Sequence, residues 1–415
     1  MESELIKGKA VLLPPQVFRN SQTINIKRIT SIDLLRGFVI VVMALDHVRD
    51  YFHADYFYYN PEDMLQTNGA VFFTRWITHF CAPAFVFLAG TSAFLVGERK
   101  TKNELAAFLL KRGVWLILLE FVVINLAWSF NPSYPYFRLQ VIWVLGLCMV
   151  VMAAVVYLPP KVILIIGLII LFGHNLLDTI QVSTNSFSDF LWGVIHQRKR
   201  FLIGDRIVAT GYPFLAWFGI MALGYCFGHF YKRGADAAIR RKSLLIIGGV
   251  AIALFLLFRG VNAYGDMKPW EVQNSFVLSI CSFFNTTKYP PSMLYTLMTL
   301  GPVIMLLAFL EKPLKRIGRF FIVFGRVPLF FYILHLYLIH GLATIAVVLS
   351  GRPWTDMIST TNFNAVDSPW LKGYGFSLWQ VYLIWLLVVA MLYPLCRWYD
   401  GYKTAHKEKW WLSYL

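Results

Sequence analysis

Ionisable side chains gather in an apolar stretch near the start of the sequence, where a charge inside a membrane would be costly. The stretch from Arg36 to His53 contains Asp46, His47 and Asp50. Asp46 and Asp50 are four residues apart and His53 follows about one turn later, so on a helix the three share a face. Asp50, or a residue on another helix, could hold one ring nitrogen of His47 and leave the other free as a base. The pattern predicts catalysis or substrate binding by His47, with the two carboxylates beside it.

Two more histidines are expected at a comparable depth in other apolar stretches. His79 lies shortly before Pro83, and His335 lies within the stretch 320–349. We therefore expect His47, His79 and His335 to meet within the membrane as a catalytic group. His79 and His335 could equally be hydrogen-bonding groups between helices. A zinc site is chemically possible, but no local ligand spacing supports it, so no metal is expected.

The composition indicates which elements must position these residues. Of the 415 residues 58% are hydrophobic, 17% are aromatic and only 14% are charged, which excludes an ordinary water-soluble fold. A helix of about 20 apolar residues crosses a bilayer. We expect an all-α, polytopic transmembrane helical bundle with about ten membrane-spanning helices. The ten apolar windows are about 34–54, 70–97, 113–130, 138–158, 161–180, 211–231, 243–262, 290–311, 320–349 and 376–397.

The net charge of +16 comes from short basic clusters between the apolar windows rather than from one basic domain. This placement argues against nucleic acid as a partner. Positive residues are retained on the cytoplasmic side, and most of the 38 Lys and Arg residues fall on the side shared by both ends of the chain. We expect both termini to be cytoplasmic, with a polar segment at 1–30, a transmembrane domain at 31–397 and a tail at 398–415.

The connections expected on the opposite face are long and rich in Tyr, Trp, Asn, Pro and Asp. They cover about 53–70, 181–210, 263–289 and 350–375. Aromatic faces with hydrogen-bonding neighbours suit sugar rings, although an interfacial aromatic belt would give the same composition. The candidate substrate-binding residues are His53, Arg75, Trp270 and Lys288.

Four motifs of the sequence resemble those of one family of membrane enzymes. They are Ser31-Ile-Asp33-Leu-Leu-Arg36-Gly followed by Asp46-His47, then Pro83-Ala-Phe-Val-Phe-Leu-Ala-Gly90-Thr-Ser, Lys288-Tyr-Pro-Pro-Ser292 and Gly325-Arg-Val-Pro-Leu-Phe-Phe-Tyr-Ile-Leu-His335. In order and spacing they resemble the heparan-alpha-glucosaminide N-acetyltransferase-like family of transmembrane acyltransferases, in its bacterial branch. The resemblance runs from about residue 30 to residue 397.

The resemblance implies an acetyltransferase that works across the bilayer. Cytoplasmic acetyl-CoA would be the donor, and the amine or hydroxyl of a sugar or glycan on the other side would be the acceptor. His47 would remove the acceptor proton, and Asp46 or Asp50 would orient its ring. Guanidinium groups bind phosphate bidentately, so the expected partners of the CoA phosphates are Arg36, Arg112, Arg319 and Arg326.

The resemblance leaves several points open. In animal members of the family an asparagine matches Asp46 and the reacting histidine comes beyond this span, so His47 and His53 both remain candidates for the base. We expect a multi-pass protein of the bacterial inner membrane, in contact with lipid, and a homo-oligomer is possible. The alternative is a proton-coupled transporter of a small polar solute, in which Asp46, His47 and Asp50 relay protons. Basic residues at one mouth of the site, and the lack of an evident repeat, favour the enzyme.

Overall fold

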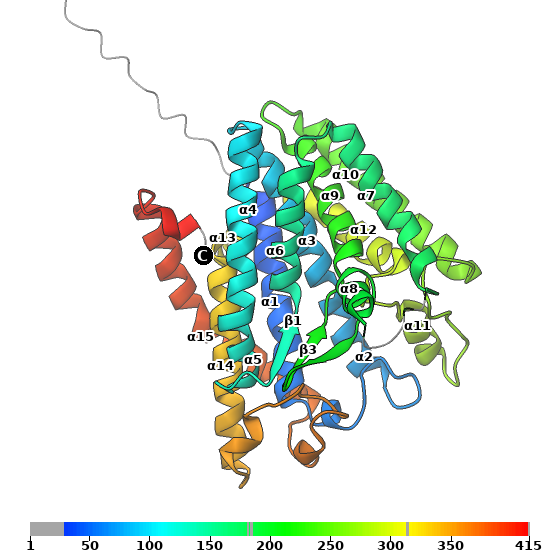
Figure 1. Cartoon of the computed structure of the whole chain (residues 1–415), viewed down its shortest axis with the longest axis vertical. Coiled ribbons are helices and arrows are strands. Elements are labelled where there is room, and N and C mark those ends of the chain that lie inside the picture. The colour runs from blue at the N-terminus through cyan, green and yellow to red at the C-terminus, as the bar shows by residue number, and fades with distance from the viewer. Residues whose placement is uncertain (1–28, 181, 183–185, 313–314, 414–415) are drawn as a thin grey trace, which may run out of the picture.

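The computed structural model describes residues 29–180, 182, 186–312 and 315–413, and within them the chain is mostly helical (Figure 1). The expected cytoplasmic segment 1–30 lies outside the described residues except for its last two. All ten apolar windows coincide with helices, some of them broken by a turn. These helices are α1 (Thr30–Phe52), α2 (Gly69–Trp76), α3 (Cys81–Gly97), α4 (Lys102–Leu119), α5 (Asn125–Ser129), α6 (Val141–Val155), α7 (Pro160–Gly173), α9 (Phe214–Phe227), α10 (Ala237–Val261), α12 (Met293–Leu310), α13 (Lys315–Arg326), α14 (Pro328–Leu349) and α15 (Leu378–Ala405). The shorter helices α8 (Phe187–Ile195) and α11 (Phe276–Phe284) lie in connections between them.

Seven helical segments of the described chain are long and apolar enough to cross a membrane. They are Gly69–Gly97, Pro160–Leu177, Phe214–Tyr231, Ala237–Val261, Met293–Leu310, Pro328–Leu349 and Leu378–Ala405. Only 22% of the apolar window of α10 is buried inside the protein, so its hydrophobic side chains face outward, where lipid would cover them. The chain is therefore an integral membrane protein. Helix α1 has a comparable length, 23 residues, but carries the charged cluster that ends at Asp50.

Helix α1 lies inside the bundle and packs against α3, α12, α13, α14 and α15. Glycines allow the closest of these contacts. A Cβ atom on Gly37 would lie 1.7 Å from the carbonyl oxygen of Phe321, and one on Gly325 would lie 1.7 Å from that of Asp33. The backbones of α1 and α13 therefore touch, which is a common way to join helices in lipid. Helices α3 and α9 are joined in the same way through Gly90.

The far end of α1 is tied to the beginning of α15. The backbone N–H of Phe376 donates to the carbonyl of Phe52 at 2.7 Å, and the N–H of Ala54 donates to the carbonyl of Phe376 at 3.1 Å. Because the two helices also pack side by side, Thr30 at the start of α1 and Ala405 at the end of α15 lie on the same side of the bundle.

A small sheet lies in the connections near the far end of α1, and the all-α prediction did not include it (Figure 1). Strand β1 (Tyr136–Leu139) pairs in parallel with β3 (Arg206–Thr210), and β2 (Arg200–Ile203) pairs with β3 in antiparallel orientation. The register aligns Arg138 with Ala209. The sheet thus fixes Arg138 close to the base of the bundle, where a cavity opens.

Candidate functional site

Two cavities are lined by successive parts of α1. The first, about 350 Å³, is named here the arginine pocket; its polar lining residues are Arg36, Ser92, Arg112, Arg326, Tyr332 and Lys403. The second, about 340 Å³, is named the histidine cavity; its ionisable lining residues other than tyrosine are Asp46, His47, Arg49, Asp50, Glu62, Arg75, Arg138, Arg198 and Lys288. Met43 lines the arginine pocket and His47, one turn later, lines the histidine cavity. Gln140 lines the histidine cavity, and the next residue in the chain, Val141, lines the arginine pocket. About one helical turn therefore separates the cavities.

His47 and His335 form a hydrogen-bonded pair. The Nδ1 atom of His47 lies 2.7 Å from Nε2 of His335, and the two rings are stacked. The Nδ1 atom of His335 lies 3.1 Å from the carbonyl oxygen of Phe331, which can only accept, so that nitrogen carries a proton. In a neutral His335 the Nε2 atom is then the acceptor, and His47 donates through Nδ1–H. His47 is half-buried and is left with an unprotonated Nε2 atom, which is the form a general base requires.

The carboxylates near His47 pair with arginines. Asp46 forms ion pairs with Arg75 at 2.5 Å and with Arg49 at 2.9 Å, and Asp50 pairs with Arg49 at 2.6 Å. In the described part of the chain neither carboxylate hydrogen-bonds to His47. Of the two partners that the sequence left open, the structure therefore has a residue on another helix, His335, next to the His47 ring.

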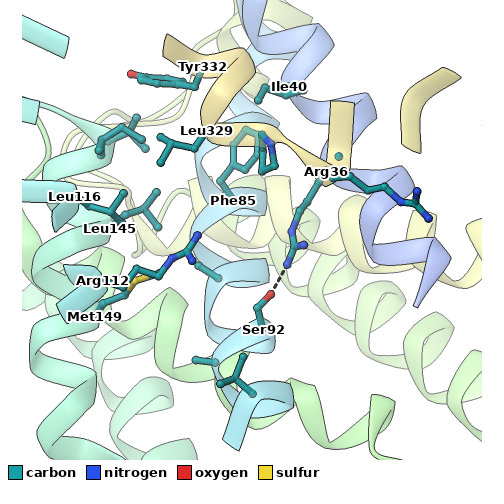
Figure 2. A pocket seen from close by; sticks show the side chains of 18 of the residues that line it. Arg36, Ile40, Phe85, Ser92, Arg112, Leu116, Leu145, Met149, Leu329 and Tyr332 are labelled. Carbon is teal, nitrogen blue, oxygen red and sulfur yellow. Dashed lines mark hydrogen bonds between the residues drawn. The ribbon is translucent and has the colours of Figure 1, made fainter. Parts of the chain in front are cut away.

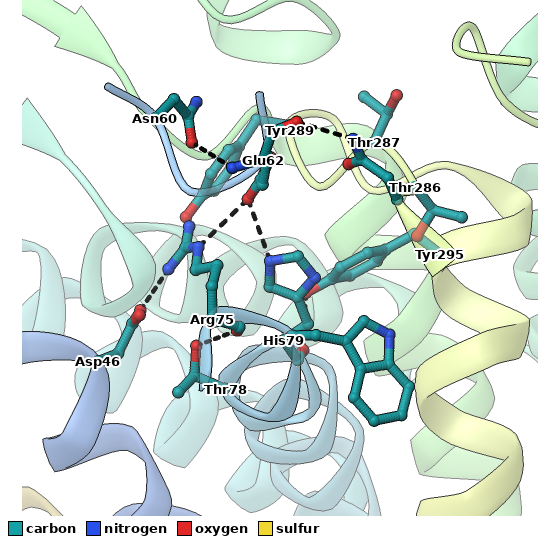
Figure 3. A network of polar contacts seen from close by, with 12 residues as sticks. Asp46, Asn60, Glu62, Arg75, Thr78, His79, Thr286, Thr287, Tyr289 and Tyr295 are labelled. Atoms are coloured by element: carbon teal, nitrogen blue, oxygen red, sulfur yellow. Dashed lines mark hydrogen bonds and ion pairs between the residues drawn. The ribbon is translucent and has the colours of Figure 1, made fainter. Parts of the chain in front are cut away.

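His79 belongs to the same polar network but not to the histidine pair (Figure 3). Its Nε2 atom lies 3.2 Å from Oε1 of Glu62, which in turn accepts from Arg75 at 3.2 Å. Burial raises the pKa of Glu62, but the hydrogen bond with His79 and the charge of Arg75 outweigh it and hold that pKa well below its usual range. Glu62 therefore stays ionised and links His79 through Arg75 to Asp46. His79 itself is buried and does not line the histidine cavity.

Three of the four arginines expected to bind CoA line the arginine pocket: Arg36, Arg112 and Arg326 (Figure 2). Arg36 hydrogen-bonds to the Ser92 hydroxyl and lies at the same end of the view as Arg112, whereas Tyr332 lies at the other end. Arg326 forms an ion pair with Asp400 at 3.3 Å. The fourth, Arg319, is exposed on α13 and does not line the pocket.

The residues expected to bind the acceptor divide into two groups. Arg75 and Lys288 line the histidine cavity, and His53 and Trp270 do not. His53 is buried, and its Nε2 atom lies 3.9 Å from the carboxylate of Asp55. Trp270 packs its ring on Phe283, away from this cavity.

Several lining residues were not predicted from the sequence. Arg198 and Glu62 lie in connections, where a charge is not costly, and Arg138 lies at the edge of the apolar window 138–158. Arg138 is 3% exposed and donates to Oδ1 of Asn362 at 3.0 Å, and Arg198 lies over the ring of Tyr289. Of the lining residues that were not predicted, only Arg49 could have been found from the sequence, because it is a charged residue inside an apolar window.

The histidine cavity has a surplus of positive charge. Arg49, Arg75, Arg138, Arg198 and Lys288 face three carboxylates in its lining. This surplus lowers the pKa of Tyr289, which lies in the connection before α12. Burial raises the pKa of Tyr289, but the charges of Lys288 and Arg75 outweigh it, and the pKa lies below its ordinary value. Within the described ranges no group of three or more His, Cys, Asp or Glu side chains could hold a metal ion.

An integral membrane bundle with two neighbouring cavities, one lined mainly by apolar side chains and the other by charged ones, and with a histidine pair beside the second, has the organisation of a membrane-embedded enzyme. The family model described as "Heparan-alpha-glucosaminide N-acetyltransferase, catalytic" matches residues 28–263, which is more than half of the sequence. The chain belongs to this family, as the sequence motifs predicted, and is therefore an acetyltransferase-family membrane protein. The match includes His47 and His79 and ends before the helix that carries His335. A search of curated proteins found no significant match.

Proposed function

We propose that the protein transfers an acetyl group from acetyl-CoA in the arginine pocket to a sugar acceptor in the histidine cavity. The observation that carries this proposal is the position of His47. It lies where the two cavities are about one helical turn apart, and His335 holds its ring. A thioester entering from one side and a nucleophile entering from the other would meet beside this imidazole.

His47 acts as the general base in the proposed reaction. Its Nε2 atom takes a proton from the acceptor amine or hydroxyl as the nucleophile attacks the thioester carbonyl. The proton then passes from His47 to the sulfur of CoA as the C–S bond breaks. His335 acts as a positioning residue, since its Nε2 atom accepts from Nδ1–H of His47 and stabilises the imidazolium that forms. His53 does not line the histidine cavity, which favours His47 as the base.

The arginine pocket suits the donor. Arg36, Arg112, Arg326 and Lys403 bring positive charge to its lining, and the rest of the lining is largely apolar, which fits phosphates followed by an aliphatic arm. Arg319 lies outside the pocket and has no part in the proposal.

The histidine cavity suits an acceptor with hydroxyl groups and a negative charge. Tyr56, Tyr59, Trp128, Tyr212 and Tyr289 line it together with the surplus of cations. Aromatic rings pack on the apolar faces of sugars, and a surplus of cations favours an anionic group on the acceptor. Asp46 and Asp50 would position Arg49 and Arg75 for this acceptor rather than orient His47.

The arginine pocket would open to the cytoplasm, where acetyl-CoA is made. The start of α1 and the end of α15 lie on the same side of the bundle, and Arg36 and Lys403, near these ends, line this pocket. Most of the 38 Lys and Arg residues fall on the side expected to hold both ends of the chain, which favours the cytoplasm for that side. With ten spans, both termini would be cytoplasmic, and in a bacterium the membrane would be the inner one.

The test combines purified protein in lipid vesicles, acetyl-CoA labelled in the acetyl group and a panel of amino sugars, neutral sugars and their anionic derivatives. We expect labelled acceptor to accumulate, with a preference for anionic members of the panel. His47→Gln should abolish transfer and leave CoA binding largely unchanged. The matched control is His340→Gln, because His340 is buried on α14 and lines neither cavity; its ring nitrogens contact the carbonyl oxygens of Ala127 and Met357 and the hydroxyl of Tyr51. Full transfer by the His47 variant would refute the assignment of the base.

A further inference from the structure

Tyr332 lies at the junction of the two cavities. It is 4% exposed and lines the arginine pocket at the end opposite Arg36 and Ser92 (Figure 2). Its ring centroid lies 5.3 Å from that of His335 and 6.4 Å from that of His47. Of the polar side chains that line the arginine pocket, Tyr332 is the one whose ring packs against the histidine pair.

The hydroxyl of Tyr332 is a hydrogen-bond donor without a protein acceptor among the described residues. The indole N–H of Trp128 lies near the Tyr332 oxygen but forms no hydrogen bond with it. That N–H is buried and has no better acceptor in the described chain. Trp128 also packs on His47, with 5.0 Å between ring centroids. The O–H of Tyr332 is thus left to donate to whatever occupies the pocket.

Tyr337, on the same helix, has a structural role and can be compared with Tyr332. Its hydroxyl donates to the carbonyl oxygen of Val123 at 2.9 Å and so joins α14 to the turn after α4. Tyr332 makes no such link, although it is the more deeply buried of the two. Burying a hydroxyl without an acceptor is unfavourable, so Tyr332 fits a site in which the acceptor arrives with the substrate.

We propose that Tyr332 is a catalytic residue that donates a hydrogen bond to the thioester carbonyl oxygen, and that Trp128 positions it; this inference rests on the proposed acetyl transfer. As the acceptor nitrogen or oxygen forms its bond to the carbonyl carbon, the π electrons of the carbonyl move onto its oxygen. The resulting oxyanion accepts the hydrogen bond from Tyr332, which keeps its proton. The carbonyl then re-forms, the C–S bond breaks, and the thiolate of CoA receives the proton that His47 took from the acceptor. A donor placed where negative charge develops lowers the barrier more than it strengthens substrate binding.

The test is the variant Tyr332→Phe, compared with Tyr337→Phe, in steady-state transfer of labelled acetyl from acetyl-CoA. Loss of one oxyanion donor lowers kcat by about 100- to 1,000-fold, and the affinity for CoA, measured by calorimetry, should stay within about threefold. Tyr337→Phe should lower the melting temperature and leave kcat close to that of the wild type. Trp128→Phe removes the indole N–H and should lower kcat by about 3- to 10-fold. The double variant should be no slower than Tyr332→Phe alone, because Trp128 acts through the tyrosine.

Each outcome separates this inference from the proposed function. A wild-type protein that binds CoA but transfers no acetyl group to any acceptor refutes the function, and the inference with it. An active wild type with an equally active Tyr332→Phe variant refutes only the role of the tyrosine. A Tyr332→Phe variant that loses CoA affinity and kcat in parallel has lost ground-state binding, which also overturns the inference. If that variant does not fold, the test falls on Trp128→Phe: an unchanged kcat in this variant overturns the proposed positioning of Tyr332 by the indole.

Discussion

Replacing His335 by leucine should remove the acceptor that fixes the His47 ring without replacing any residue that lines either cavity. The Nδ1–H of His47, which now donates over 2.7 Å, would be left without its partner in a buried setting. Losing one partner of a buried hydrogen bond costs about 1–3 kcal/mol, and the loss falls on the reactive orientation and tautomer of His47. If the whole cost appears in the barrier, kcat falls by about 5- to 150-fold, with KM for acetyl-CoA nearly unchanged.

The assay is release of free CoA thiol in the presence of the best acceptor, with the protein in lipid vesicles at a fixed pH. His335→Gln provides the matched comparison, because its amide oxygen can accept from Nδ1–H of His47 while its amide nitrogen donates. We expect His335→Gln to be several-fold faster than His335→Leu. His340→Gln on the same helix should have normal kcat, because His340 lines neither cavity.

Two results would contradict the reasoning. Wild-type kcat in His335→Leu would mean that His47 needs no partner to set its tautomer. Equal losses in the leucine and glutamine variants, together with equal losses of thermal stability, would mean that His335 contributes packing rather than an acceptor for the His47 proton.

Three further predictions concern the helix contacts, the polar network and the donor. Gly37→Ala should destabilise the protein by about 1–3 kcal/mol, because the added Cβ overlaps the backbone of α13, whereas Gly260→Ala on α10 has nothing within 4 Å and should be neutral in a thermal melt. Glu62 has a depressed pKa, so its contribution to stability is complete above its unfolded pKa of 4.5 and is lost as pH falls through the lower folded value. The difference in melting temperature between wild type and Glu62→Gln should therefore stay constant from about pH 8 to pH 5 and shrink below about pH 4.5. Arg36→Gln should raise KM for acetyl-CoA by about tenfold or more and weaken the dependence of KM on salt, while Arg233→Gln, an exposed control outside the pocket, should do neither.

The sequence predicts the helices well because the bilayer imposes a simple requirement on composition. A span needs a long apolar run, and every such run in this chain is helical. The small sheet has no comparable signal. Its strands are four or five residues long, and its parallel pairing joins residues 136–139 to residues 207–210, which are far apart in the sequence. The sequence of neither segment specifies the other as its partner.

The residues of the candidate site also differ in how well the sequence predicts them. Charged residues inside apolar runs, such as Asp46 and His47, stand out because lipid makes them costly. Glu62 lies in a connection and Arg138 at the edge of an apolar window, where charge is common, and only the folded chain brings them to the cavity. Helix periodicity gave the face on which His47 lies but not the rotation of the neighbouring helices, so it could not choose between Asp50 and His335 as its partner. That choice depends on the tight contacts of α1 with its neighbours.

The location of Arg36 and His47 on one continuous helix has a consequence for the choice of donor. Eleven residues of α-helix set a rise of about 16 Å between them, and the backbone contact with α13 keeps this part of α1 from shifting. In the proposed reaction α1 therefore fixes the distance between the guanidinium that binds phosphate and the imidazole that acts as the base. An acyl donor must carry its anionic group and its reactive carbonyl at the two ends of a long arm, so a compact compound such as acetyl phosphate could not engage the guanidinium and the imidazole at once.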